Sequence, residues 1–216
     1  MRIPTDAEIL ALHTKHAPTP AALDLVYGHC LIVRGIAEQL LARVDDIDGD
    51  LVRAGALLHD IGVYRLYDDA GELDHADYIR HGVLGHELLA EEGLPERICR
   101  FASHHTGVGI SRDEVIRQGL ALPPGDYMAE TREETIVMYA DKFHSKTEPP
   151  SFVTAAEFAE GVRRFGPDKV AAFEALRDQF GDPDLSYARA VTDGSVTTLS
   201  TAARAVAMHA GMPTPS

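Results

Sequence analysis

The sequence contains few cysteines and few basic residues, and each shortage excludes a class of protein. Only Cys30 and Cys99 occur among 216 residues, and neither belongs to a CxxC motif. Two cysteines make no disulfide framework in a chain of this length, so we expect a cytoplasmic protein. Lys and Arg number 20 against 34 Asp and Glu, which gives a formal net charge of −14. Because nonspecific nucleic-acid binding requires clustered cations, we expect a small phosphorylated substrate and no long nucleic acid.

Long hydrophobic runs are also absent from the sequence. No segment approaches 18 uninterrupted apolar residues, the length at which a run is typical of a membrane-spanning helix. The first residues, MRIPTDAEILAL, carry acidic side chains within their apolar stretch, unlike a secretory signal peptide. We therefore expect neither secretion nor a membrane-spanning segment.

Helix-start signals recur along the chain. In a capping box, a Ser or Thr and a Glu three residues later satisfy backbone N–H groups that the first helical turn leaves unpaired. This pattern begins at Thr5, Ser111, Thr131 and Thr154. No convincing run of strand-like alternation is present, so the sequence predicts an all-α protein. Helices are expected near residues 5–16, 20–44, 50–61, 77–92, 95–105, 111–118, 131–146, 154–165 and 167–180, with weaker helix after 197.

The stretch ALLHDIGVYR, residues 56–65, places polar groups where the chain is otherwise building a core. An apolar, helix-like run over residues 51–58 ends at His59 and Asp60. Burying an ionised carboxylate without a partner costs several kcal/mol in practice, so buried carboxylates are usually paired or bind a metal. The stretch therefore indicates a cation. Histidine is the commonest metal ligand in proteins, and the chain has 11 histidines.

Three further histidines fall on apolar helix faces. His29 shares the i, i+3, i+4 spacing of the apolar residues around it, so its side chain is expected to point inward. Taken alone, it is more simply a core histidine that is hydrogen-bonded to a carbonyl. The same phase argument selects His105 over its neighbour His104, and His81 over His86. His104 is expected either at the rim of the site or directly behind the ligands.

Asp141 is the last candidate ligand. In ETIVMYADKFHSK, residues 134–146, it lies on one side of a helix dominated by apolar residues. An isolated Asp in such a helix is usually solvated or hydrogen-bonded locally, but beside several inward histidines it is a further oxygen ligand. The candidate set is His29, His59, Asp60, His81, His105 and Asp141. No pair among them has the tight spacing of a zinc finger, so local spacing alone is weak evidence for a metal.

These motifs occur in an order that is specific. The chain carries His29, HDIG at 59–62, HGVLGHELL at 81–89, HHTGVGI at 104–110 and YADK at 139–142. Over roughly residues 27–146 it resembles the HD-domain metal-dependent phosphohydrolases of the HDIG subgroup, and among them the group that includes dinucleoside tetraphosphate hydrolases. The resemblance implies one helical HD-domain bundle over residues 1–182, with a metal site in its centre. Residues 183–216 are then a C-terminal extension, partly helical and frayed at its end.

The resemblance also implies which residues hold metal. The family's four minimal ligands fall on His29, His59, Asp60 and Asp141, and its two-metal members add the positions of His81 and His105. One or two divalent transition ions are therefore expected, with two favoured. Mixed nitrogen and oxygen ligands suit iron, manganese or zinc.

Two departures from the family's pattern bear on the substrate. Many members carry a lysine after HDIG, where this chain has Val63, so Lys142 and Arg65 are the candidates for a cation beside the site. No GYP follows the HD element, which argues against the cyclic-di-guanylate phosphodiesterase branch. The turn at 107–110, GVGI, either brings backbone N–H groups to a phosphate or simply joins two helices.

The resemblance and the charge together predict a metal-dependent phosphohydrolase for a small phosphoester or nucleotide. Asp60 is expected to contact both ions and Lys142 the substrate, with a metal-activated water as the nucleophile. Two alternatives use the same scaffold: a mixed-valence di-iron oxygenase, and a non-catalytic HD domain that binds a ligand. The sequence predicts no particular oligomeric state.

Overall fold

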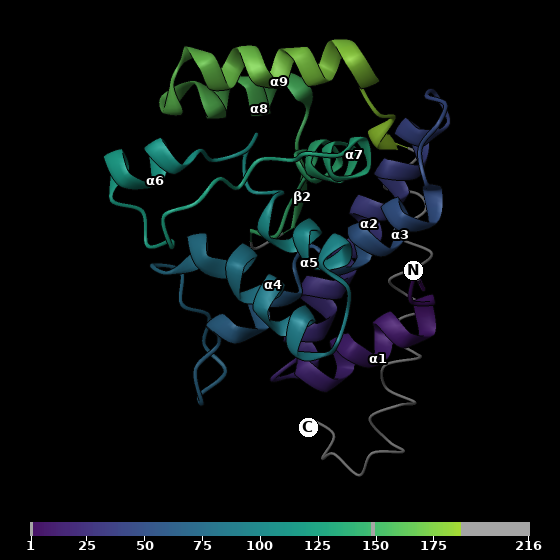
Figure 1. Cartoon of the computed structure of the whole chain (residues 1–216), viewed down its shortest axis with the longest axis vertical. Coiled ribbons are helices and arrows are strands. Elements are labelled where there is room, and N and C mark those ends of the chain that lie inside the picture. Colours follow the sequence, from purple (N-terminus) through teal and green to yellow (C-terminus); the bar gives the residue numbers. More distant parts are fainter. Residues whose placement is uncertain (1, 148–149, 187–216) are drawn as a thin grey trace.

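Helices make up most of the chain that the computed structural model describes, residues 2–147 and 150–186. The α-helices are α1 (Asp6–His16), α2 (Pro20–Leu41), α3 (Gly49–Leu58), α4 (His81–Glu91), α5 (Glu96–Ser103), α6 (Arg112–Gln118), α7 (Arg132–Asp141), α8 (Ala155–Val162) and α9 (Pro167–Phe180). Short 3₁₀ helices are η1 (Ile61–Leu66), η2 (Tyr78–Arg80) and η3 (Arg163–Phe165). The predicted all-α class is confirmed (Figure 1). The helix predicted after 197 and most of the predicted extension 183–216 lie outside the described residues.

Most helix starts follow the capping chemistry that the sequence indicated. α1, α6 and α8 begin with complete capping boxes. At the start of α7, the Thr131 hydroxyl accepts the backbone N–H of Glu134. The Glu134 carboxylate pairs with Arg100 instead of completing the box, at 2.8 Å between Oε1 and Nε. This pair connects α7 to α5.

α7 ends earlier than the sequence predicted. The helix expected over residues 131–146 stops at Asp141, and the chain then forms strand β1 (His144–Ser145). β1 pairs antiparallel with β2 (Ser151–Phe152), with His144 opposite Phe152. The expectation that helix continues to 146 was therefore wrong. Strands of two residues are too short to produce a detectable alternation of polar and apolar side chains.

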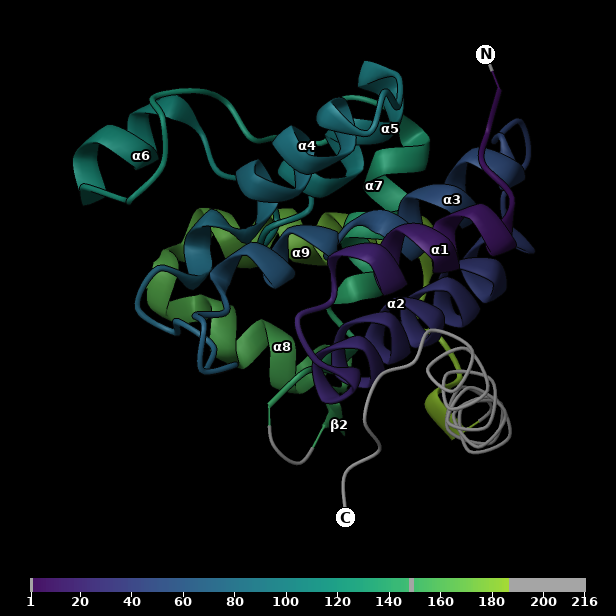
Figure 2. The ribbon, with the colours of Figure 1, turned by 90° about the horizontal axis from the view of Figure 1, so that it is seen from below.

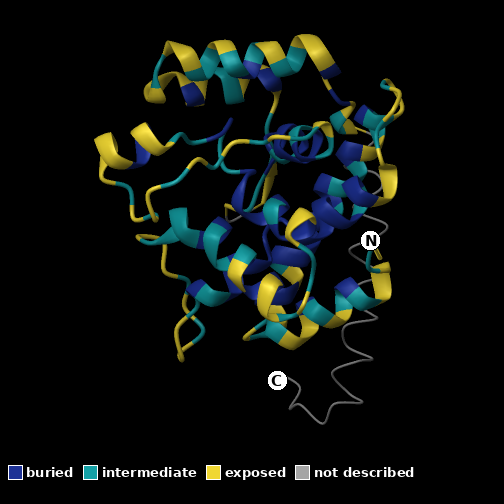
Figure 3. Ribbon diagram, viewed as in Figure 1, coloured by how far each residue is buried: buried dark blue, intermediate teal, exposed yellow. Residues whose placement is uncertain are grey.

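The core lies where α2, α3, α5 and α7 meet, and each helix contributes fully or almost fully buried side chains (Figure 3). Examples, one from each helix, are Ile36, Leu57, Phe101 and Tyr139. By length and composition α2 could cross a membrane, but 56% of its most apolar window is buried inside the bundle. The apolar character of α2 is therefore accounted for by its place in the core.

Further helices flank this core on two sides. α8 and α9 lie side by side at one end of the molecule, α4 and α5 lie toward the other, and α7 runs between them (Figure 1). Figure 2 shows α6 standing apart from the other helices. Phe173 of α9 lies 5.6 Å from Tyr139 of α7 and 4.7 Å from Phe158 of α8, measured between ring centroids. α7, which carries Asp141, is thus packed from both sides.

Gly62 of the HDIG motif lets two segments approach at backbone distance. It belongs to η1, which packs against the start of α4. A Cβ on Gly62 would overlap the carbonyl oxygen of His81 and the backbone nitrogen of Gly85. Backbone atoms cannot swing aside as the end of a flexible side chain can, so only glycine fits. Because Asp60 directly precedes η1 and His81 begins α4, this contact fixes how close the two residues come.

We expect Gly62→Ala to destabilise the protein by roughly 1–3 kcal/mol, because the added methyl group forces η1 and α4 apart. Gly35→Ala in α2 is the matched control, since a Cβ there meets no atom within 4 Å. Alanine at that position should stabilise the helix by up to about 1 kcal/mol. Urea denaturation measures both changes, and equal stability of the two variants would contradict the close packing at Gly62.

Candidate metal centre

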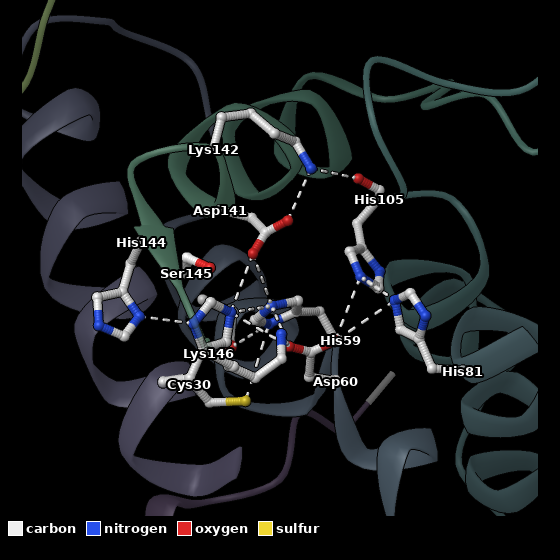
Figure 4. A network of polar contacts seen from close by, with 12 residues as sticks. Cys30, His59, Asp60, His81, His105, Asp141, Lys142, His144, Ser145 and Lys146 are labelled. Carbon is white, nitrogen blue, oxygen red and sulfur yellow. Dashed lines mark hydrogen bonds and ion pairs between the residues drawn. The ribbon is translucent and has the colours of Figure 1, made fainter. Parts of the chain in front are cut away.

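Six side chains from separate parts of the chain converge in the core (Figure 4). His29 lies in the middle of α2, and His81 is the first residue of α4. The other four lie at or just after helix C-termini: His59 and Asp60 after α3, His105 after α5, and Asp141 at the end of α7. Helix C-termini carry partial negative charge, so three of them together favour a cation. All six candidates from the sequence therefore lie in one place.

His29, His59, Asp60 and Asp141 form the first group. Nε2 of His29 lies 2.9 Å from Oδ1 of Asp141 and 3.1 Å from Oδ2 of Asp60. The same nitrogen lies 3.2 Å from Nε2 of His59. All ligand atoms of the group lie within 4.8 Å of one another. Two imidazoles and two carboxylates thus face one small volume, as the ligands of a single ion do.

Asp60, His81 and His105 form the second group. The Nε2 atoms of the two histidines lie 3.0 Å apart. Oδ1 of Asp60 lies 3.5 Å from Nε2 of His81 and 3.4 Å from Nε2 of His105. Since Oδ2 of Asp60 faces the first group, the two oxygens of one carboxylate serve the two groups separately.

Hydrogen bonds on the far side of three rings direct lone pairs into the site. Nδ1 of His59, His81 and His105 each lies close to a backbone carbonyl three residues earlier, at 2.8, 2.7 and 2.7 Å. Because a carbonyl only accepts, Nδ1 carries the proton in each neutral ring. Each Nε2 then presents a lone pair to the cluster. Rings fixed in this way are typical of metal-binding histidines.

Burial keeps the histidines of the second group neutral. It lowers the pKa of His81 to about 3 and also lowers the pKa of His105. Burial alone would raise the pKa of Asp60, but Lys146 and His59 outweigh it and hold that pKa well below its usual range. Oδ1 of Asp60 is buried and has no hydrogen-bond partner in the described part of the chain. Two lone pairs and an unpartnered anionic oxygen fit a divalent metal ion.

The first group attracts positive charge as well. Burial opposes a charge on His59, but the adjacent Asp60 carboxylate outweighs it and raises the pKa of His59 well above its ordinary value. Burial likewise opposes a charge on Asp141, but Lys142 and His29 hold its pKa well below the usual range. The group therefore takes up a proton in the absence of a metal. Because histidine binds metals in its unprotonated form, an ion here displaces that proton.

The two histidines that the phase argument placed outside the cluster have other partners. Nδ1 of His86 lies 2.9 Å from the Ser103 hydroxyl, and its Nε2 lies 3.1 Å from a Glu96 carboxylate oxygen. Nδ1 of His104 lies 2.6 Å from the same Ser103 hydroxyl. Neither ring reaches Asp60. The structure thus keeps both rings out of the cluster, although His104 is itself buried.

The cation beside the Asp60 carboxylate is one that the sequence analysis missed. Lys146 forms an ion pair with Oδ2 of Asp60, and its Nζ lies 5.9 Å from the ring centroid of Tyr78. Burial opposes a charge on Lys146, but Asp60 outweighs it and raises the pKa of Lys146. Arg65 instead pairs near the surface with Glu91, so its candidacy as a cation in the site was wrong.

Lys142 lies in the site with its ammonium bonded to the protein itself. Nζ donates to Oδ2 of Asp141 at 2.7 Å and to the carbonyl oxygen of His105 at 2.9 Å. Its side chain is only 4% exposed. These two contacts connect ligands of both groups, and the contact of Lys142 with substrate stays a prediction.

His144 is a second residue that the sequence analysis missed. Its Nδ1 lies 2.8 Å from Nδ1 of His29. Burial, followed by His29 and Lys146, lowers the pKa of His144 to about 3. In a helix continued to 146, Lys146 would point about 140° away from Asp141. The turn from α7 into β1 instead brings His144 and Lys146 back to the site. A periodic sequence pattern does not reveal such a turn.

A cavity of about 510 Å³ lies beside the cluster. Its polar wall contains Asp141, Lys142, His144 and Lys146, and its apolar wall includes Leu25, Val63, Val153 and Phe158. This volume lies within the range of small-molecule sites in proteins. Val63, at the position where many family members carry a lysine, lines this cavity. Lys146 supplies an ammonium group to the same cavity from another part of the chain.

The fold and the site together define a class of protein: a helical bundle around a buried cluster of histidine and aspartate side chains. The model of the family described as HD domain matches residues 26–146, a segment that contains all six clustered residues. The chain belongs to the HD domain family.

Several known proteins are similar to parts of this chain. An uncharacterized protein of Methanocaldococcus jannaschii, MJ0778, is 41% identical over 120 residues, which are 54% of this chain and 64% of that protein. A tRNA (cytidine(56)-2′-O)-methyltransferase of Thermoplasma volcanium is 37% identical over 120 residues, 56% of this chain and 32% of the enzyme. The chain thus matches less than two thirds of the length of these relatives. The HD domain of the L. monocytogenes phosphodiesterase PgpH has a TM-score of 0.49 and 20% identity, over 89% of this chain and 97% of that one.

We expect His105→Ala to lower the number of bound Mn²⁺ ions at saturation from two per chain to one. The substitution removes a ligand of the second group and leaves the four residues of the first group in place. His104→Ala is the control, because His104 neighbours His105 but bonds to Ser103. Equilibrium dialysis with elemental analysis measures the metal content. Equal content in the two variants would contradict the assignment of His105.

Proposed function

We propose that this protein is a metal-dependent phosphohydrolase acting on a small phosphoester or nucleotide. The observation that carries the proposal is the buried Asp60 carboxylate, whose two oxygens face two separate groups of metal-ligand atoms. Two divalent ions held in this way supply Lewis acidity and an activated water near neutral pH. The mixed nitrogen and oxygen ligands suit iron, manganese or zinc better than magnesium.

The chain's own groups prepare the site for this chemistry. Backbone carbonyls fix the rings of His59, His81 and His105, so the Nε2 atom of each ring already points into the site before a metal arrives. Lys142 holds one oxygen of Asp141 and leaves the other, Oδ1, facing His29. Ligands set in advance lose little conformational freedom on binding, which favours metal affinity.

Lys146 supplies the cation beside the site that a lysine directly after HDIG supplies in many family members. It lines the cavity and its side chain is 17% exposed, so a solute in the cavity can reach it. A charged metal ligand such as Asp60 no longer needs an ammonium partner once an ion binds it. The Lys146 ammonium can then donate to phosphate oxygens, as lysines do in many phosphate sites.

Size and charge favour a small substrate over a polymer. The cavity of about 510 Å³ admits a drug-sized molecule, and a net charge of −14 repels an extended polyanion. Bound cations would make the pocket itself attractive to a small anion. The order of the sequence motifs further supports a place in the HDIG subgroup, near the dinucleoside tetraphosphate hydrolases. We include this placement in the proposal.

Asp60→Ala should abolish hydrolysis and leave the helical fold intact, because both groups lose their shared ligand. His86→Ala should change turnover little, since His86 lies outside the cluster. Chromatography of the reaction products measures turnover of nucleotides, dinucleoside polyphosphates and oligonucleotides by the protein loaded with Mn²⁺ or with iron, with and without oxygen, and circular dichroism checks the fold. Wild-type turnover by Asp60→Ala would overturn the proposal. Activity that requires both oxygen and iron, and that manganese does not support, would favour the di-iron oxygenase instead.

Lys146→Ala should raise the KM for a small phosphorylated substrate by about 10- to 100-fold, the effect of losing one charge-assisted hydrogen bond of roughly 1.5–3 kcal/mol. Lys142→Ala is the informative comparison, because it should weaken Mn²⁺ binding through Asp141. Steady-state kinetics and metal titration separate the two effects. An unchanged KM in Lys146→Ala would remove Lys146 from the substrate site.

A further inference from the structure

A second cavity, of about 410 Å³, adjoins the cavity of the metal centre. Gly107, Val153 and Phe158 line both cavities. Gly107 comes two residues after His105, so the wall of the second cavity begins almost at a metal ligand. The two cavities therefore lie next to each other and share part of their walls.

The wall of this second cavity is mainly apolar. Its apolar lining includes Val108, Ile110, Leu120, Val153, Phe158 and Val162. Val108 and Val162 are 5% and 6% exposed, so these side chains belong to the packed body of the protein. The polar residues Gln118, Glu157 and Arg164 are exposed and lie at the rim.

The buried charges in the wall are already paired with each other. Nζ of Lys169 donates to the carbonyl oxygen of Gly109 at 2.7 Å and to Glu114 at 2.7 Å. Glu114 also accepts the backbone N–H of Ser111 at 2.8 Å. A nucleobase needs partners for several ring donors and acceptors, and burying them unpaired costs free energy. A hydrocarbon group makes no such demand.

We propose that the second cavity binds the hydrocarbon part of a phosphoester whose phosphate lies at the metal centre. This inference rests on the proposed function and narrows its substrate class. The substrate would be a small phosphate ester of an apolar alcohol, and the cavity would supply most of the discrimination between esters. Each methylene that enters the cavity should then tighten binding by about fourfold, from ~0.8 kcal/mol per buried CH₂.

The test measures binding without turnover. Methyl-, butyl- and octylphosphonate, whose P–C bond resists hydrolysis, are titrated calorimetrically into the full-length protein loaded with Mn²⁺. If three or more methylenes reach the cavity, octylphosphonate should bind at least about 60-fold more tightly than methylphosphonate, at about fourfold for each.

Gly161→Trp is designed to fill the cavity. Gly161 of α8 lines it, and a Cβ there meets no atom within 4 Å. The variant should bind octylphosphonate no better than methylphosphonate while keeping the affinity of the wild type for methylphosphonate. Gly35→Trp, on α2, also has open space at its Cβ and should behave as the wild type. Leu120→Asn, which makes the wall polar, should reduce the preference for octylphosphonate at least tenfold.

The outcomes separate this inference from the proposed function. Equal affinity for methyl- and octylphosphonate would overturn the inference and leave phosphate binding at the metal centre intact. A preference for octylphosphonate that survives in both Gly161→Trp and Leu120→Asn would place the hydrocarbon elsewhere and overturn it too. A nucleoside phosphonate that binds more tightly than octylphosphonate would assign the cavity to a base. If no phosphonate binds and no phosphoester is hydrolysed, the proposed function fails and this inference with it.

Discussion

A buried carboxylate that needs cations on both sides is the constraint on which this structure depends. Asp60 is 0% exposed, yet neighbouring charges keep its pKa well below the usual range. Lys146 compensates Oδ2, while Oδ1 faces the neutral rings of His81 and His105 without a hydrogen-bond partner in the described chain. An unpaired charge in a core costs several kcal/mol. The C-terminal ends of α3, α5 and α7 meet here, and their dipoles add to the demand for positive charge.

The fold meets this constraint through close backbone packing. Gly62 allows η1 to lie directly against α4, so that Asp60 and His81 approach from two segments. Gly85 of α4 in turn packs against Ala102 of α5, where a Cβ on the glycine would lie 2.9 Å from the alanine Cβ. These two glycines bring His81 and His105 to the same oxygen of Asp60. The metal site is therefore a property of helix spacing as much as of ligand identity.

On the function proposed above, substrate specificity and chemistry would reside in adjoining parts of the molecule. The polar cavity carries the charged groups, with Lys146 paired to Asp60 and Lys142 to Asp141. The apolar cavity beside it is formed largely by residues 106–120 and by α8, which contribute no metal ligand. Substrate preference can therefore change through these segments without disturbing the cluster.

The sequence by itself determined the all-α class, most helix starts and the inward-facing histidines, because capping and helical phase are local properties. His81 was separable from His86, and His105 from His104, on phase alone. Only the tertiary structure decided that the two oxygens of Asp60 face different groups. It also decided that Lys146, rather than Arg65, accompanies that carboxylate. Both depend on where α7 ends and how the chain turns into β1, and such a turn is set by packing against α2 and β2, which no local pattern encodes.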